Sequence, residues 1–260
     1  RTAGKIATAL MVWYAVHLCA VALRTYSEYA RIVAMPETPG LPLRVLMLLA
    51  GAYLVKRGIS VIGRWSIGVL CTVAAILLIT GFLLLNQMDL KNLFPILDTS
   101  PETILQSSYN HFALPYGETI LILSVADRLP KKMRPSRFLL EGLFLTLLLL
   151  LLMMLRNLLA LGGPMLKLES FPSYAAARII DVSDFLARVE GGVSTNFILL
   201  GVTRVAISLL AASRGLAQLF HVENYKTMVM PAAMGCEGST THRRSRHHQL
   251  FRGTQDRDVR

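Results

Sequence analysis

The chain has 260 residues, of which 53% are hydrophobic and 17% are charged, and its formal net charge is +11. With a mean hydropathy of +0.50, it carries more apolar surface than a soluble domain of this length needs to bury, which excludes an ordinary soluble fold. The basic residues fall in short segments between apolar runs, a pattern that favours membrane topology over nucleic-acid binding.

Six apolar runs are predicted to cross a membrane as helices, because a bilayer core of about 30 Å needs about 20 apolar residues of helix. They are residues 6–23, 43–55, 65–85, 109–126, 138–155 and 192–212. The third run is the clearest, since it contains no charged side chain, whereas the second is short and carries Arg44 near one end. The expected fold class is therefore all-α, a transmembrane bundle of several spans formed by residues 1–234.

Lysine and arginine in the short loops predict the orientation of the spans, because positively charged loops stay on the cytoplasmic side. The loop after the second run holds Lys56, Arg57 and Arg64, and the loop after the fourth run holds five further basic residues. The loop between those two, residues 86–102, is mainly acidic and is therefore placed outside. This alternation puts the amino end and the chain after Phe220 in the cytoplasm.

Two segments are not predicted to be spans. Residues 174–189 mix apolar side chains with charges at three- and four-residue spacings, such as Arg178 and Asp181, which is typical of a helix lying at the outer membrane surface. Residues 235–260 carry six arginines and three histidines and almost nothing apolar, so a disordered basic tail is expected there.

The fourth run contains the best candidate for a ligand-binding site, Pro115-Tyr116-Gly117-Glu118. Proline removes a backbone donor and glycine relaxes the backbone, so the helix is expected to unwind here and to leave main-chain polar groups beside an acidic side chain. Discontinuous helices of this kind form the ligand sites of many secondary transporters. The alternative is a simple proline kink, with Glu118 paired to a neighbouring helix.

Two further charges lie within the predicted spans. Arg204 stands near the middle of the sixth run, and it must find a carboxylate, a backbone carbonyl or water there. Glu118 and Glu141 are the expected partners, so Arg204 and Glu141 are candidates for an intramembrane charge or coupling site. A structural ion pair is an equal alternative for Arg204, and solvation near the basic loop is an alternative for Glu141.

Signatures of catalysis are absent from the sequence. There is no Gly-rich phosphate loop, no paired-cysteine zinc spacing and no nucleophile elbow. His242, His247 and His248 sit in the basic tail, where such residues are usually solvated. We therefore expect no enzyme activity, no catalytic residue, no metal site and no cofactor.

Five stretches in a consistent order resemble the spore germination permeases, the B subunits of GerA-type nutrient germinant receptors. The stretches are residues 56–59, 92–97, 115–118, 178–190 and 215–220, and the resemblance covers residues 4–234. None of these motifs is specific alone, and the signal comes from their order between suitably placed spans.

The resemblance implies a partial amino-acid permease fold of the LeuT-like, inverted-repeat type, in which the first and sixth of ten helices are broken around the ligand. The run with residues 115–118 would be that sixth helix. The implied function is a subunit that binds a small nutrient such as an amino acid in the spore inner membrane and triggers germination with receptor A and C subunits. The alternative is a cation-coupled amino-acid transporter that works in the cell membrane without partner subunits.

Against the family pattern, the chain is expected to be a truncated fragment. It starts at the third helix of the family fold, and after residues 231–234 the sequence turns to arginine, serine and histidine where further spans would follow. Arg204 stands where the family pattern suggests lysine, and Asp181 where it suggests asparagine. From these departures we expect that the chain alone does not complete a ligand site.

Overall fold

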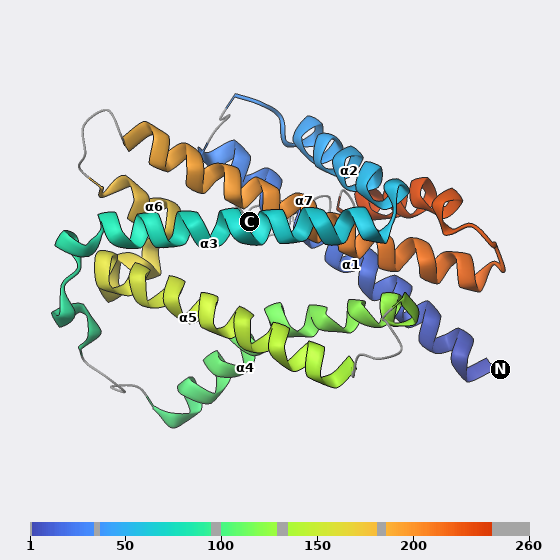
Figure 1. The fold of residues 1–260 in the computed structure, drawn as a ribbon, viewed down its shortest axis with the longest axis horizontal. Helices are drawn as coiled ribbons and strands as arrows, with labels where there is room; N and C mark the ends of the chain where they lie inside the picture. Colours follow the sequence, from blue (N-terminus) through green and yellow to red (C-terminus); the bar gives the residue numbers. More distant parts are fainter. Residues whose placement is uncertain (1, 34–36, 95–99, 129–134, 181–185, 241–260) are drawn as a thin grey trace, which may run out of the picture. The chain divides into compact units, whose positions relative to one another are not determined.

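Helices make up most of the chain in the computed structural model, which describes residues 2–33, 37–94, 100–128, 135–180 and 186–240. The elements are α1 (Thr2–Val33), α2 (Gly40–Arg57), α3 (Ile59–Leu83), η1 (Leu85–Gln87), η2 (Leu90–Leu93), α4 (Pro101–Gly117), η3 (Glu118–Arg128), α5 (Pro135–Leu168), α6 (Pro172–Arg178), α7 (Leu186–Leu219) and η5 (Tyr225–Met228) (Figure 1). Residues 229–240 are helical as well. Because no strand occurs in any of these segments, the all-α prediction is confirmed.

Four of the described helical segments are long and apolar enough to cross a membrane: Thr2–Val33, Ile59–Leu83, Leu139–Leu168 and Val189–Leu219. Large apolar side chains remain exposed on them, for example Phe82 at 75% and Phe144 at 68%. Hydrocarbon contact removes the cost that such surfaces would carry in water. The protein is thus an integral, multi-span helical membrane protein, as its composition predicts.

The remaining two predicted runs fall on elements outside these four. Residues 43–55 lie in α2, a helix of 18 residues that includes Arg44 and ends on Lys56 and Arg57. Residues 109–126 extend across the end of α4 and most of η3. The charges of α2 and the change of helix type after α4 interrupt these apolar runs.

The described chain divides into two compact units. The described residues within 1–66 and 200–260 form unit 1, and those within 67–199 form unit 2. The division falls within α3 and within α7, each of which contributes residues to both units.

Glycines on α7 let helices of unit 1 approach closely. A Cβ atom added at Gly215 would lie 2.4 Å from Cγ2 of Val12 on α1, and one added at Gly201 would lie 2.6 Å from both the Tyr26 ring and the Met47 methyl group. Small residues at helix contacts are typical of membrane proteins, where helices associate by close packing rather than by a hydrophobic driving force.

The core of unit 2 includes the second half of α5 and the short helix α6. The three alanines at 175–177 in α6 are buried together with Leu84, Leu161, Ile180 and Val189. The small side chains of these alanines allow the short helix α6 to pack closely against the long helix α5 (Figure 1). A polar contact also joins α3 to α7 in this unit, since the Asn196 amide donates to the Thr72 carbonyl at 3.3 Å.

The outer segment predicted as one helix over residues 174–189 has a different form. Helix α6 ends at Arg178, residues 181–185 with Asp181 lie outside the described residues, and α7 begins at Leu186. The Tyr174 hydroxyl donates to Glu190 Oε2 at 3.4 Å. Burial and the nearby Glu190 carboxylate raise the pKa of Tyr174, while Arg178 lowers it.

The structure also differs from the tail expected over residues 235–260. Residues 235–240 continue the helix that starts at residue 229, and residues 241–260 lie outside the described residues. Cys236 and Thr240 are buried in unit 1, and Glu237 forms an ion pair with Arg44 of α2. Cys236 and Glu237 therefore belong to the packed part of the protein.

Candidate ligand-binding site

The predicted ligand-binding segment contains a change of helix type. Helix α4 ends at Gly117, and the chain continues directly as the 3₁₀-helix η3 from Glu118. The Tyr116 carbonyl accepts from the Glu118 amide and, at 2.6 Å, from the Thr119 hydroxyl. Pro115 lies in the last turn of α4, where its missing N–H removes one helical hydrogen bond. The interruption is thus an α-to-3₁₀ change, whereas the sequence predicts unwinding.

The length of η3 marks this segment as unusual. It runs for 11 residues, whereas 3₁₀-helices longer than three or four residues are uncommon because their hydrogen bonds are poorly aligned. Long 3₁₀ stretches often mark hinges or strained functional segments. The segment after Gly117 therefore has weaker backbone hydrogen bonding than a regular α-helix.

Tyr116 supplies a buried polar atom at this junction. Its ring stacks on Phe112 with a centroid distance of 5.1 Å and an interplanar angle of 20°. Its hydroxyl oxygen is buried and has no hydrogen-bond partner among the described residues. Buried tyrosine hydroxyls usually find a partner, so this atom is suited to accept or donate a hydrogen bond to a guest molecule.

Glu118 is the acidic residue of the predicted segment, and it is half-buried at the first position of η3. Gly117, the last residue of α4, is half-buried too. The junction therefore brings a carboxylate, a phenol hydroxyl and a change in backbone hydrogen bonding into four consecutive residues.

The two other candidate charges have separate surroundings. Glu141 is exposed on α5, and its Oε1 accepts from Nε of Arg137 at 2.8 Å, one helical turn away. Exposed pairs of this kind contribute about 0–1 kcal/mol. Arg204 is half-buried on α7 in unit 1, where its guanidinium group hydrogen-bonds the Tyr26 side chain.

A second interruption of a membrane helix was not predicted from the sequence. Within α5, Gly162 adopts φ 73° and ψ 162°, which are not helical values. The freed carbonyl of Leu159 accepts from the Asp89 amide at 3.1 Å and from the Asn92 side-chain amide at 2.9 Å. The loop that contains η2 therefore satisfies the broken helix and holds it in place.

A buried polar cluster lies less than two turns before this interruption. Arg156 is 6% exposed, and its guanidinium group donates to Oδ1 of Asn157 from Nε at 3.2 Å and from Nη2 at 2.7 Å. It also donates to the Thr80 hydroxyl on α3, and Asn157 donates to Ser173 at 3.0 Å. All of these partners are neutral.

The cluster leaves a charge uncompensated. Two of the five N–H groups of Arg156 have no partner among the described residues, and no described carboxylate pairs with it. Burial of an ion is costly unless a counter-charge is present. Chemically, this arrangement is suited to a carboxylate, which binds two parallel guanidinium N–H groups.

The sequence did not identify Arg156 as a candidate, because the fifth predicted span ends at residue 155. An arginine just after a span is expected to lie at the membrane surface. In the structure the membrane-length segment continues to Leu168. The neighbouring pair Arg156 and Asn157, followed within seven residues by Gly162, Gly163 and Pro164, is the signal that could have located it.

Comparison with known proteins assigns the family. A family model described as "Spore germination protein" matches residues 3–237. Over 235 residues the chain is 25% identical to "Spore germination protein KB" of Bacillus subtilis (strain 168), covering 87% of this chain and 61% of that protein. It is 27% identical over 235 residues to "Putative spore germination protein YfkT" of the same organism, covering 89% of this chain and 63% of that protein.

The chain thus spans about three fifths of the length of the curated relatives it matches. No solved structure matches it. Because the family model covers nearly the whole chain, from the start of α1 into the helix of residues 229–240, this protein belongs to the spore germination protein family.

Proposed function

We propose that this chain is the membrane-embedded, ligand-binding part of a spore nutrient germinant receptor. In this proposal it lies in the spore inner membrane, binds a small nutrient such as an amino acid, and triggers germination with receptor A and C subunits. Family membership supports a role in germination. The observation that carries the binding role is the buried Tyr116 hydroxyl at the α4–η3 junction, which has no hydrogen-bond partner in the part of the chain that the structure describes.

The chemistry of the junction fits a small zwitterion. Glu118 offers a carboxylate for an ammonium group, and the Tyr116 hydroxyl offers one directional hydrogen bond. Arg156, on α5 elsewhere in the same unit, is a separate candidate that offers guanidinium N–H groups for a carboxylate. None of these roles needs a catalytic residue or a cofactor, so we propose a binding protein rather than an enzyme.

The sharpest test is Tyr116→Phe in the full-length protein, because it removes a single oxygen atom. Spores carrying the variant should need about three- to tenfold more nutrient for half-maximal germination, the effect of losing one hydrogen bond to a ligand of about 0.5–1.5 kcal/mol. Tyr109→Phe is the matched control, since Tyr109 is 71% exposed on the same helix and should leave the response unchanged. Equal responses of both variants and the wild type would count against the site.

Glu118→Gln tests the charge at the junction. A nutrient ammonium group that meets Glu118 should lose affinity about tenfold or more, since hydrogen bonds to charged groups contribute about 1.5–3 kcal/mol. The protein level should stay normal, as it should in the control Glu169→Gln, which alters an exposed residue of unit 2. A normal nutrient response with Glu118→Gln would favour a purely structural subunit.

Uptake measurements separate the receptor from a transporter. Labelled amino acid should not accumulate in vesicles that contain the full-length protein alone. The proposed function is to bind the nutrient and to trigger germination with the A and C subunits, and it includes no movement of solute across the membrane. Ion-dependent accumulation by the protein alone would instead favour a cation-coupled transporter. In that case Arg204 and Glu141 would be the first residues to substitute, as intramembrane charges that could couple ion and solute movement.

A further inference from the structure

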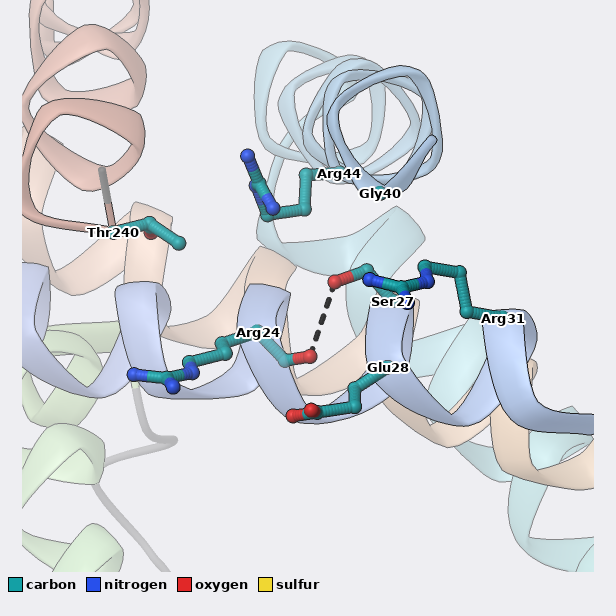
Figure 2. A pocket seen from close by; sticks show the side chains of 7 residues that line it. All are labelled: Arg24, Ser27, Glu28, Arg31, Gly40, Arg44 and Thr240. Atoms are coloured by element: carbon teal, nitrogen blue, oxygen red, sulfur yellow. Dashed lines mark hydrogen bonds between the residues drawn. The ribbon is translucent and has the colours of Figure 1, made fainter. Parts of the chain in front are cut away.

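A polar cavity of about 140 Å³ lies in unit 1. Its walls come from the second half of α1, the start of α2 and the helix of residues 229–240 (Figure 2). The lining residues are Arg24, Ser27, Glu28, Arg31, Gly40, Arg44 and Thr240. A cavity of this size compares with ones that hold a benzene-sized molecule.

The lining is strongly basic. Arg24, Arg31 and Arg44 contribute three positive charges against the single carboxylate of Glu28. Figure 2 shows Arg31 reaching back along α1 toward Ser27, and Arg44 reaching from α2 into the space between α1 and the helix that carries Thr240. Arginines from two different helices therefore line one small space.

Arg44 is the most buried of the three, with a side chain that is 10% exposed. Its Nε donates to Oε1 of Glu237 at 3.0 Å. Among the described residues, its terminal nitrogens have no partner, and Nη1 lies near Gly40, where an added Cβ would be 3.4 Å away. Glu237 thus anchors the side chain and leaves the donating end of the guanidinium group facing the cavity.

The first turn of α2 adds to the positive potential. Helix α2 begins at Gly40, its N-cap residue Pro39 provides no capping side chain, and its first turn holds no acidic residue. The unpaired N–H groups of a helix start favour an anion and disfavour a cation. Placing Arg31 and Arg44 beside this helix start is therefore unfavourable unless an anion occupies the cavity.

Counting the acids that line the cavity or pair with its lining leaves an excess of positive charge. If Glu237 is assigned to Arg44 and Glu28 to Arg24, one helical turn away, the charge of Arg31 remains together with the start of α2. The exposed Glu37, which precedes α2, is not one of the lining residues. A single small oxyanion would balance both. Several guanidinium groups around one anion are typical of phosphate recognition, because their N–H groups match its oxygen atoms.

We propose that this cavity binds a phosphate-class oxyanion, supplied either by free phosphate or by the headgroup of an anionic lipid. The lipid source is chemically reasonable because α1 is long enough to cross the membrane, and arginines near the end of a membrane helix reach the level of the lipid headgroups. This site is independent of the nutrient-binding proposal, since all of its residues lie in unit 1.

The test uses the purified full-length protein and two probes. Inorganic phosphate, titrated against chloride at equal ionic strength, tests the free anion by the shift in thermal unfolding midpoint. Nanodiscs of phosphatidylglycerol or phosphatidylcholine, followed by native mass spectrometry, test the lipid by the number of phospholipid molecules retained. A response to phosphate alone identifies a soluble anion, and retention of phosphatidylglycerol alone identifies a lipid headgroup.

The variants are chosen to keep the fold intact. Arg24→Gln and Arg31→Gln remove exposed arginines, and each should weaken binding of the responding probe about tenfold. Glu28→Gln should strengthen binding, because it removes the one acidic group of the lining. Arg64→Gln, an exposed arginine of unit 1 outside the cavity, should change nothing.

Two results would overturn the proposal. One is the absence of a response to either probe by the wild-type protein. The other is an equal loss of binding in Arg64→Gln and Arg31→Gln, which would show general attraction to the net charge of the protein rather than a site.

Discussion

A guanidinium group that is buried among neutral side chains constrains what can surround it. Arg156 donates three hydrogen bonds to Asn157 and Thr80, and these satisfy three of its five N–H groups without neutralising its charge. If Arg156 only held the helices together, a carboxylate beside it would serve equally well, because arginines within membrane helices commonly pair with acidic side chains. The missing counter-charge is thus what a ligand carboxylate would supply.

Asn157→Asp tests this role, because it supplies a carboxylate of nearly the same shape beside Arg156. The protein level should be unchanged or higher, since the buried cation then has a counter-ion. The nutrient concentration for half-maximal germination should rise about tenfold or more, because the guanidinium charge is no longer available to the ligand. The readouts are a dose-response curve of germination and an immunoblot of spore membranes.

A normal dose-response curve for Asn157→Asp would assign Arg156 to the architecture of unit 2. Arg156→Gln then provides an independent measurement. It should weaken the nutrient response if the charge meets the ligand, and it should lower the protein level instead if the cluster only joins α3, α5 and α6.

At the scale of elements, both interrupted helices of unit 2 combine glycine and proline, but only one could be found from the sequence. The Pro115-Tyr116-Gly117-Glu118 segment was visible because an acidic residue follows the proline and glycine inside an apolar run. Gly162 was not visible, because its interruption depends on Asp89 and Asn92, which are about 70 residues earlier in the chain. Such tertiary hydrogen bonds leave no local pattern.

Gly162→Ala should destabilise the protein through its backbone. At φ 73° and ψ 162° an L-residue costs about 1–3 kcal/mol, and the added Cβ would lie 3.1 Å from Oδ1 of Asn92. Gly163→Ala is the matched control, because no atom lies within 4 Å of its added Cβ. The thermal unfolding midpoint in detergent should fall clearly for Gly162→Ala and little for Gly163→Ala.

Equal midpoints for the two variants would show that α5 continues as a regular helix through Gly162. Asn92→Leu provides a second check on the same feature, since it removes the side-chain donor to the Leu159 carbonyl. It should lower the midpoint in the same direction as Gly162→Ala.

For the whole molecule, composition predicted the class of fold but not the extent of the packed region. Apolar runs of sufficient length identify an all-α membrane protein whatever their neighbours are. Residues 235–240 were assigned to a tail because their sequence turns polar, yet the helix that contains them packs through Cys236 and pairs through Glu237. A single part-buried ion pair with Arg44, 193 residues away, cannot be read from local composition.

Three contacts give the helix of residues 229–240 a consistent direction in unit 1. Gly235 lies near Val16, the Cys236 side chain hydrogen-bonds that of Cys19, and Thr240 lines a cavity with Arg24 and Ser27. The residue numbers along α1 rise in the same order as those along the helix of residues 229–240, so this helix runs parallel to α1. The family model also extends to residue 237, which covers the first two of these contacts.

The two buried thiols allow this arrangement to be measured directly. Cys19 and Cys236 are both fully buried, and their side chains are in contact, so a membrane-permeable oxidant should join them in a disulfide bond. The third cysteine, Cys71 on α3, is exposed and is replaced by alanine to leave a single pair. A protease site is inserted beside Glu223, an exposed residue that lies between Cys19 and Cys236 in the sequence, so that cleavage separates the two cysteines into different fragments.

After oxidation and cleavage the two fragments should migrate together on a non-reducing gel and separate when reduced. Cys236→Ser should abolish the joined species, and fragments that separate without reductant would contradict the parallel packing of α1 and the helix of residues 229–240.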